Sequence, residues 1–424
     1  MMFINKNIIW VPIGHYISII LLLLIGKTTF AEPSISVLIN PQYNAYSSDT
    51  LFAVPDEYIE KPEITSQQTI EMTGNHAIPW STINYLFSAY LALNDRDSAQ
   101  TNISTNELYL AQSFYNWEVI MGRRINSGGF GYGFRPLDVI QQYDQQSTLR
   151  QSLIGKNMLG LEYFSGLSSW SLLWINPRQE SVATDNNTQL ESLLVKYSTS
   201  LENSDLQTLI RYNKKNKLQA GLGGIQIVSD AFSVHSSLLL SQQYQKQLHF
   251  LAGQTSQLLA SEYPYETITQ KGGIQALIGF SWSTSSKHSI IAEYWYNDMA
   301  YSKQQWDNLF QLAERQQQLL EQPGLPTEDI LGNIAWTASA TQSAMLSMHN
   351  LMLQWSYDAD YWKPSINILM SPVDSSSMLT LAVSRTYNLL KIETGVRSFN
   401  GSKDSVYGGL IIDRMLYMTV SSEY

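Results

Sequence analysis

Apolar and polar residues alternate along most of this chain with a period of two, most clearly between residues 191 and 243. This period is typical of β-strands, whose successive side chains point to opposite faces. In this stretch one face carries Leu193, Val195, Tyr197, Thr199 and Leu201; Leu206, Thr208, Ile210 and Tyr212; Leu218, Ala220 and Leu222; and Phe232, Val234, Ser236, Leu238 and Leu240. Short polar turns such as "ENSD" and "KKNK" separate the runs, which predicts four consecutive antiparallel strands.

The same pattern recurs from about residue 81 to the end of the chain. It gives roughly 16–18 candidate strands of about 9–12 residues, the length that crosses a bilayer as a tilted strand. Residues 32–79 are polar and show no clear period, so we expect a lead segment there. The predicted fold is all-β, an antiparallel transmembrane barrel over residues 80–424 with its strands in up-and-down order.

The polar faces separate this barrel from a soluble β-sandwich or propeller, which also alternates. A soluble sheet carries many Lys and Glu on its outer face. Here the polar faces are mostly Ser, Gln, Gly, Asn and Thr. The apolar faces often end in aromatic residues, which matches the interfacial girdles of outer-membrane barrels. Examples are Tyr197, Tyr212, Trp282, Trp355 and Tyr357.

Composition agrees with an exported membrane protein. Charged residues make up only 15% of the 424 residues, whereas aromatic residues make up 12%. The net charge of −10 argues against a nucleic-acid partner, which needs a basic face. The chain has no cysteine, which excludes disulfides, cysteine metal sites and thiol catalysis.

The N-terminus has the organisation of a secretory signal. Lys6 precedes the apolar run 17–26, and Thr29 and Ala31 occupy the small-residue positions of a cleavage site. A retained membrane anchor is the alternative, but the apolar run is short for a spanning helix. We therefore predict a cleavable signal peptide over residues 1–31 and export to the bacterial outer membrane.

Two segments depart from the strand pattern. Residues 304–329 have helical spacing at Trp306, Leu309, Leu312 and Leu319, which predicts a helix of about four turns in a long loop. Residues 126–150 are rich in glycine and then polar. Long loops of such barrels usually lie on the extracellular side and can fold inward.

The segment "WEVIMGRRINSGGFGYGFRPLDVI" resembles a pattern of outer-membrane porin-like families of Gram-negative bacteria, including alginate-export-like proteins. In that pattern a strand ends in a Gly-Arg pair, and a Gly/aromatic stretch and a "P-x-D" piece follow. The matching residues are Gly122, Arg123, Arg124, Gly131, Gly133, Arg135, Pro136 and Asp138. The resemblance implies an outer-membrane barrel with a porin-like function.

Charged residues on the polar faces are candidates for the pore lining, since charged rings set solute selectivity. The alternative is that they pair with one another and fill the interior. The candidates for the lumen or its constriction are Glu118, Arg123, Arg124, Arg135, Asp138, Lys196, Arg211, Glu293, Lys391, Glu393 and Arg397.

The loop "GGFGYGFRPLD" is a candidate constriction. Arg135 and Asp138 would lie at the narrowing, and Phe130, Tyr132 and Phe134 would offer faces to a ring-shaped solute. Glycines permit close approach of the backbone to a solute. A purely structural bend over the barrel mouth is the alternative. The spacing does not fit a nucleotide loop.

The histidines give little support for chemistry. None has metal-ligand spacing with another histidine or a close carboxylate, and no cofactor is expected. His349 lies near Ser347, and His235 shares a face with Ser233 and Ser237. A barrel-embedded hydrolase would need such a Ser–His pair and a third orienting group. We do not expect an enzyme.

The chain ends in "RMLYMTVSSEY", in which Leu416, Met418, Val420 and Tyr424 share one face. This ending predicts a closing strand recognised by the barrel assembly machinery, with outer-membrane lipid as the surrounding partner. The predicted function is a porin-like channel for passive passage of small polar or aromatic solutes. The alternatives are a non-transporting barrel that recognises a surface glycan or partner, and the embedded hydrolase.

Overall fold

The computed structural model describes residues 33–54, 61–96, 99–141, 153–177, 190–322, 324, 326–343 and 345–424. The predicted signal peptide, residues 1–31, lies outside the described residues. The strands are β1 (Ser34–Tyr46), β2 (Ile64–Ile78), β3 (Ser81–Asn94), β4 (Ala99–Phe114), β5 (Trp117–Arg124), β6 (Lys156–Ser165), β7 (Ser168–Ile175), β8 (Ser192–Leu201), β9 (Ser204–Asn213), β10 (Lys217–Ser229), β11 (Phe232–His249), β12 (Tyr265–Ser283), β13 (His288–Asn297), β14 (His349–Tyr357), β15 (Lys363–Ser371), β16 (Ser376–Tyr387), β17 (Leu390–Asn400) and β18 (Ile412–Glu423).

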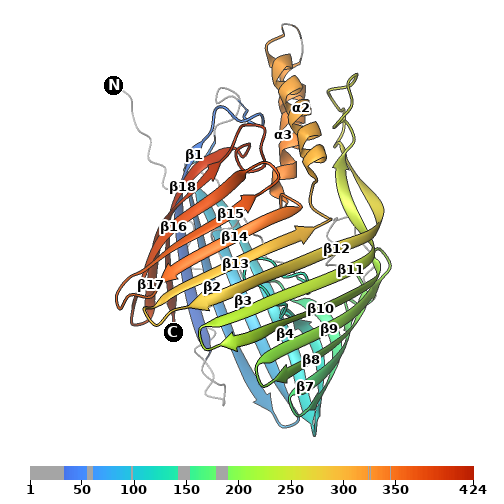
Figure 1. Cartoon of the computed structure of the whole chain (residues 1–424), viewed down its shortest axis with the longest axis vertical. Helices are drawn as coiled ribbons and strands as arrows, with labels where there is room; N and C mark the ends of the chain where they lie inside the picture. Colours follow the sequence, from blue (N-terminus) through green and yellow to red (C-terminus); the bar gives the residue numbers. More distant parts are fainter. Residues whose placement is uncertain are drawn as a thin grey trace.

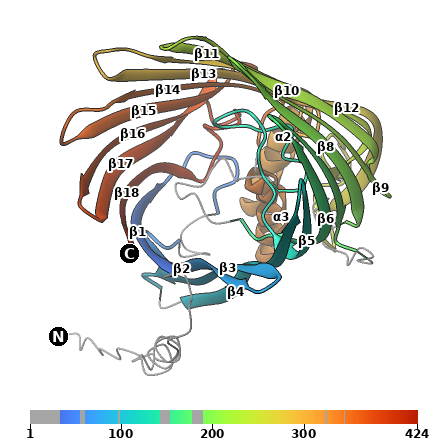
Figure 2. The same cartoon turned by 90° about the horizontal axis from the view of Figure 1, so that it is seen from below.

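These strands form one closed antiparallel sheet. Each strand pairs with its neighbours in sequence, and β18 returns to pair with β1 (Figure 2). The predicted up-and-down barrel is therefore confirmed, at the upper end of the expected strand number. Closure leaves no unpaired sheet edge, which is the condition for placing β-strands in a bilayer.

The barrel has an apolar outside and a polar inside, as strand β9 shows. Leu206, Ile210 and Tyr212 are 42%, 55% and 52% exposed, while Gln207 and Arg211 between them are buried. A soluble protein shows the opposite distribution, because its large apolar side chains are the buried ones. The exposed apolar surface therefore fits contact with lipid.

The predicted lead segment 32–79 is wrong, because its described residues include two strands of the barrel. Strand β1 pairs with β18 on one side and with β2 on the other. The alternation is hard to read in these strands because polar residues occupy outward positions of β2, such as Ser66 and Gln68. Hydrogen bonding to neighbours on both sides holds these strands in place despite their weak pattern.

Engineered cysteines can test the seam between β1 and β18, since the chain has no cysteine of its own. Val37 lies directly opposite Ser422. Such antiparallel partners have Cα atoms about 4.5–5.5 Å apart, within the reach of a disulfide. The Val37→Cys/Ser422→Cys variant is expected to cross-link almost completely on oxidation, measured by mobility on non-reducing gels. Leu38→Cys/Ser422→Cys, with side chains on opposite faces, should stay uncross-linked; equal cross-linking of both pairs would contradict this register.

The two ends of the barrel differ. At one end the strands are joined by short turns, such as Tyr115–Asn116 and Gly166–Leu167. The other end, which we call the loop end, carries the long connections. These are residues 47–63, 125–155, 176–191, 250–264, 298–348 and 401–411. Figure 1 shows the helices at the loop end and the C-terminus at the turn end. This asymmetry is typical of outer-membrane barrels.

The connection 298–348 contains α2 (Lys303–Leu320), α3 (Thr327–Ala338) and the 3₁₀-helix η2 (Ser339–Gln342). The predicted helical loop is confirmed, with two α-helices where one was expected. Ser302 and Gln305 form a capping box at the start of α2, which fixes where the helix begins. None of the helices among the described residues is long and apolar enough to cross a membrane.

The loop end is packed into a cap. Phe310 of α2 contacts Phe52 of the β1–β2 connection and Trp306, with ring centroids 5.5 Å apart in both pairs. Tyr407 of the β17–β18 connection joins the same apolar cluster and donates a hydrogen bond to Asn350. Burial raises the pKa of the Tyr407 phenol, so the hydroxyl stays protonated and remains a donor. Several loops therefore form one rigid body over part of the barrel mouth.

Candidate functional site: an inward loop in the lumen

Residues 125–141, the first part of the β5–β6 connection, fold into the barrel; we call this segment the inward loop. At its base, the backbone N–H of Ile125 donates to the Glu107 carboxylate at 2.7 Å, and that of Asn126 donates to the Gln141 side chain at 2.8 Å. Its tip contacts Glu293 of β13, which lies almost opposite β5 in the ring of strands. The inward loop therefore starts at β5 and reaches a contact far round the wall, on β13.

The inward loop has its own internal structure. The Asp138 carboxylate accepts hydrogen bonds from the backbone N–H groups of Gly128 and Gly129, at 2.9 and 2.7 Å. The Arg135 side chain donates to the carbonyl of Gly131, at 2.9 Å, and Gly131 has a φ of +123°, a conformation that side chains disfavour. Asp138 is therefore a buried residue that folds the loop, whereas it was predicted to line a constriction.

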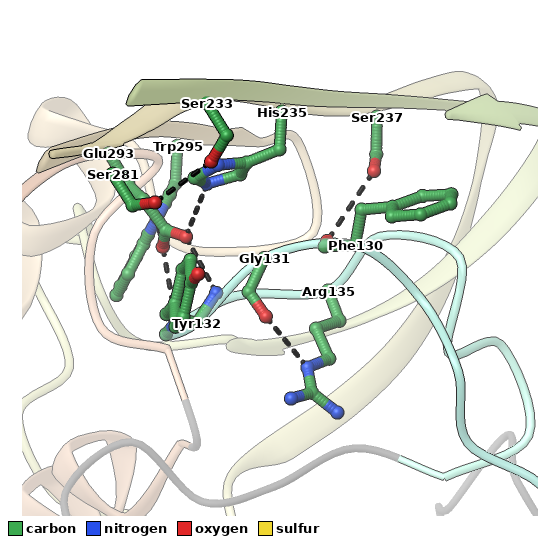
Figure 3. A network of polar contacts seen from close by, with 11 residues as sticks. Phe130, Gly131, Tyr132, Arg135, Ser233, His235, Ser237, Ser281, Glu293 and Trp295 are labelled. Atoms are coloured by element: carbon green, nitrogen blue, oxygen red, sulfur yellow. Dashed lines mark hydrogen bonds and ion pairs between the residues drawn. The ribbon is translucent and has the colours of Figure 1, made fainter. Parts of the chain in front are cut away.

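Glu293 anchors the tip of the loop to the wall (Figure 3). Its carboxylate accepts from the backbone N–H groups of Tyr132, at 2.6 Å, and Gly133, at 3.1 Å. The indole N–H of Trp295 donates to it at 2.8 Å, and Nε2 of His235 lies 2.8 Å from it. The Glu293 and His235 side chains are 0% and 1% exposed. Glu293 is therefore a structural anchor, and a carboxylate with this many donors is fixed in one position.

Glycines on the wall and in the loop make room for this contact. A Cβ placed on Gly221 or Gly223 would come within 2.6 or 2.9 Å of the Leu137 side chain. A Cβ on Gly279 would meet His235 and Glu293, at 2.6 and 2.8 Å. Small residues at inward positions of β10 and β12 thus form seats for the loop and its anchor.

Apolar packing continues along the loop. Leu137, Val139 and Ile140 are buried in one cluster with inward side chains of β6 to β11. Phe134 packs on Trp295, with ring centroids 6.0 Å apart. The inner wall under the loop is thus an apolar patch inside a polar lumen, which holds the loop in addition to the hydrogen bonds.

Two predicted lumen cations lie beneath or beside the loop. Arg211 of β9 is 2% exposed, and its Nη1 donates to the carbonyl of Val139. Arg211 Nε and Nη2 have no hydrogen-bond partner among the described residues. Lys196 of β8 faces inward, because its cross-strand partner is the buried Ser171. Arg211 therefore supports the loop and is closed off from the lumen.

The remaining predicted charges face the lumen, and they bond to groups on the same strand or on an adjacent strand. Arg124 lies 3.4 Å from Glu162, and Glu118 accepts from Ser113 at 3.4 Å. On the wall of β16 to β18, Lys391 lies 3.7 Å from Glu393, which accepts from Tyr417, and Arg397 donates to Thr380 at 3.0 Å. Positive and negative charges are thus present on both of these parts of the inner wall. This agrees with the alternative stated above, in which the inward charges pair with one another.

The prediction that Arg123 lines the lumen is wrong. Arg123 faces the same side of the sheet as its cross-strand partner Leu108 and as Met121, two residues earlier on its own strand. Both of these residues are strongly exposed on the outer face. The Arg123 guanidinium donates to the carbonyl of Thr105 at 3.0 Å. Adjacent residues of a strand face opposite sides, so Arg123 and Arg124 cannot both face inward.

The Ser–His pairs considered for catalysis do not form hydrogen-bonded pairs among the described residues. The Ser233 hydroxyl is 2.8 Å from the Ser281 hydroxyl, and Nδ1 of His235 has no hydrogen-bond partner in the part of the chain that the structure describes. His349 is bonded to Tyr294, while Ser347 accepts from Ser371. The described residues contain no group of three or more metal-ligating side chains.

Several residues of the site escaped sequence analysis, above all His235 as a partner of Glu293, and Trp295, Glu107, Gln141 and Glu162. Trp295 lies two residues after Glu293 and therefore shares its face, a signal that was available. The contact between Glu293 and the loop joins residues 161 positions apart. No local pattern reveals a contact of that kind.

No family model and no curated protein sequence matches this chain. Its structure is similar to Acinetobacter baumannii OccAB1, at 10% identity and a TM-score of 0.52, over 94% of this chain and 98% of that chain. It is also similar to Pseudomonas aeruginosa OccK8 (OprE), at 8% identity and a TM-score of 0.52, over 93% and 98% of the two chains. OccD3 (OpdP) of the same species has 9% identity and a TM-score of 0.50, over 94% and 93%.

The likeness shows the fold alone, a closed antiparallel β-barrel. The predicted barrel is confirmed at this level, and its porin-like role stays a prediction. The narrower resemblance to alginate-export-like proteins stays a prediction.

Proposed function

We propose that this protein is an outer-membrane porin-like channel that lets small polar or aromatic solutes diffuse through a narrowed lumen. The observation that carries the proposal is the inward loop, which Glu293 pins across the inside of a closed barrel. Its tip is bonded to the wall opposite the strand from which it starts. A loop held in this way would narrow the lumen.

The mechanism is passive. The apolar outer face replaces contact with water by contact with lipid, and the inner face offers hydrogen-bonding groups along the path. Arg124 and Glu162 on one side, and Lys391 and Glu393 on the other, place both signs of charge at the lumen. Paired charges give weak ion selectivity and suit uncharged or zwitterionic solutes better than a strongly charged ring would.

The location and the partners follow from the same reasoning. Short turns usually face the periplasm and long loops the outside, so the cap formed with α2 would face the medium. The C-terminal strand β18 runs to Glu423 and closes the barrel against β1, which fits recognition by the assembly machinery. The signal peptide over residues 1–31 would direct export.

Conductance in planar bilayers tests the proposal. The refolded protein is expected to give discrete current steps. The Arg135 side chain points away from the strand wall (Figure 3). Its guanidinium lies 3.9 Å from the Asp138 carboxylate. Arg135→Gln therefore should make the constriction more negative and raise the K⁺/Cl⁻ permeability ratio about twofold.

Arg123→Gln is the matched control, since it removes the same charge from the outer face and should leave the permeability ratio unchanged. An equal change in both variants would contradict the assignment of Arg135 to the pore.

A barrel that recognises a glycan or partner without transport is the second candidate. The packed cap of α2 with the β1–β2 and β17–β18 connections favours it, because such a body presents a fixed outer surface. A refolded barrel that never conducts would support this candidate over the channel.

A further inference from the structure

A hollow of about 350 Å³ lies on the inner wall, between the inward loop and the turns that follow β6 and β8. Phe164, Ser169, Ser198 and Gln207 are successive cross-strand partners and form one row on the inward face of β6 to β9. We call this row and its surroundings the serine shelf. The turn Gly166–Leu167 bounds it at the end of the barrel.

The shelf has an aromatic ring at each end. The row continues from Gln207 through Gly223 to Ser237, whose hydroxyl donates to the carbonyl of Phe130 at 3.5 Å. Phe130 and Phe164 both line the hollow. The ring of Phe164 is 42% exposed and is therefore available for contact.

The chemistry of the shelf is nearly neutral. Its lining includes four serines, of which Ser169, Ser198 and Ser200 face inward, together with the Gln207 amide and one carboxylate, Asp205; no Lys, Arg or His is among the described residues that line it. Lys196, the nearest inward cation on β8, lies one inward position beyond Ser198, toward the loop end. Hydroxyls and amides both donate and accept, whereas a site for an anion would present cations.

We propose that the serine shelf binds an uncharged ring-shaped solute with several hydroxyl groups, that is, a sugar-like molecule. The proposal rests on the channel function and names the solute class for it. Solute hydroxyls would exchange hydrogen bonds with the serine row and donate to Asp205, while the apolar faces of the solute would pack on Phe164 and Phe130. Sites of this kind combine a few polar groups with apolar faces. The solute would arrive and leave by diffusion through the lumen.

Binding is measured by calorimetry on the detergent-refolded full chain, with sucrose as the probe. We expect saturable binding. Phe164→Ala should weaken it about fivefold, the effect of losing one ring contact. Tyr90→Ala is the matched control, because Tyr90 faces the lumen from β3, away from the shelf, and should leave binding unchanged. Ser198→Ala, which removes only a hydroxyl, provides a second test if Phe164→Ala does not fold, and should weaken binding about threefold.

A small amine, ethanolamine, separates a sugar site from a cation site. A cation site would bind ethanolamine, reject sucrose and lose binding in Asp205→Asn; that result would overturn the proposal. Sucrose binding in wild type with less than a twofold change in Asp205→Asn would support it. Absence of saturable sucrose binding, or equal loss in Tyr90→Ala and Phe164→Ala, would also overturn it. The bilayer current keeps the two proposals apart: a barrel that binds sucrose and never conducts keeps the shelf and loses the channel.

Discussion

Glu293→Ala is expected to release the inward loop from the wall and to raise single-channel conductance about twofold. The substitution removes the acceptor for the N–H groups of Tyr132, Gly133 and Trp295 and the partner of His235. Trp295 and His235 are buried, so they cannot exchange the lost bonds for water while the loop stays in place. The tip of the loop would then leave the wall, and the lumen would widen.

The same variant should lower the stability of the barrel. Leaving a buried hydrogen-bond donor without its acceptor costs about 1–3 kcal/mol. Release of the loop relieves part of this cost because it returns the donors to water. The decrease in the free energy of unfolding, measured by urea denaturation, should therefore lie at or below the lower limit of that range. Glu293→Gln, which keeps the shape and one acceptor oxygen, should fall between wild type and Glu293→Ala in both measurements.

Glu118→Ala is the control. Glu118 is an inward carboxylate on β5 whose described partner is Ser113, at 3.4 Å. Its loss should change the ion selectivity slightly and leave conductance and stability near those of wild type. If Glu293→Ala conducts as wild type does and excludes the same solutes, apolar packing alone holds the loop.

The sequence carried the architecture because alternation is a local property. In β9 the apolar residues of the alternating sequence face lipid and the polar residues face the lumen. The same odd–even rule, or parity, places Lys391, Glu393 and Arg397 of β17 inside. The parity rule also excludes Arg123, which the resemblance to a porin-like motif had added beside Arg124. Where strand parity and a motif disagreed, parity agreed with the structure.

Other features were out of reach for a physical reason. Strand β2 places Ser66 and Gln68 outward, so its membership of the barrel depends on pairing with β1 and β3. The roles of Asp138, Arg211 and Glu293 in holding the loop depend on contacts between distant segments. All three residues were predicted as charged residues in or near the lumen, but strand alternation does not distinguish a residue that meets solute from one that holds the loop.

Gly133→Val should open the same contact by a steric route. A Cβ on Gly133 would lie 2.6 Å from the Trp295 ring atom Cη2 and 2.7 Å from Met352 Sδ, with Trp295 Cζ2 closer still. Both neighbours are buried and cannot move aside. The loop must therefore rise from the wall, and the bonds from Tyr132 and Gly133 to Glu293 break although every polar group is intact. Conductance should rise about twofold, as in Glu293→Ala.

Gly128→Ala is the matched control in the same loop, because a Cβ on Gly128 would meet no atom within 4 Å. Its N–H bond to Asp138 is kept, so conductance should not change. The double variant Gly133→Val/Glu293→Ala adds a sharper test. Both substitutions break one contact, so their effects on conductance should not add. Additive effects on conductance, or a Gly133→Val channel that conducts as wild type does, would mean that the tip of the loop is held elsewhere. If the two effects do not add, the width of the lumen depends on this single contact on β13.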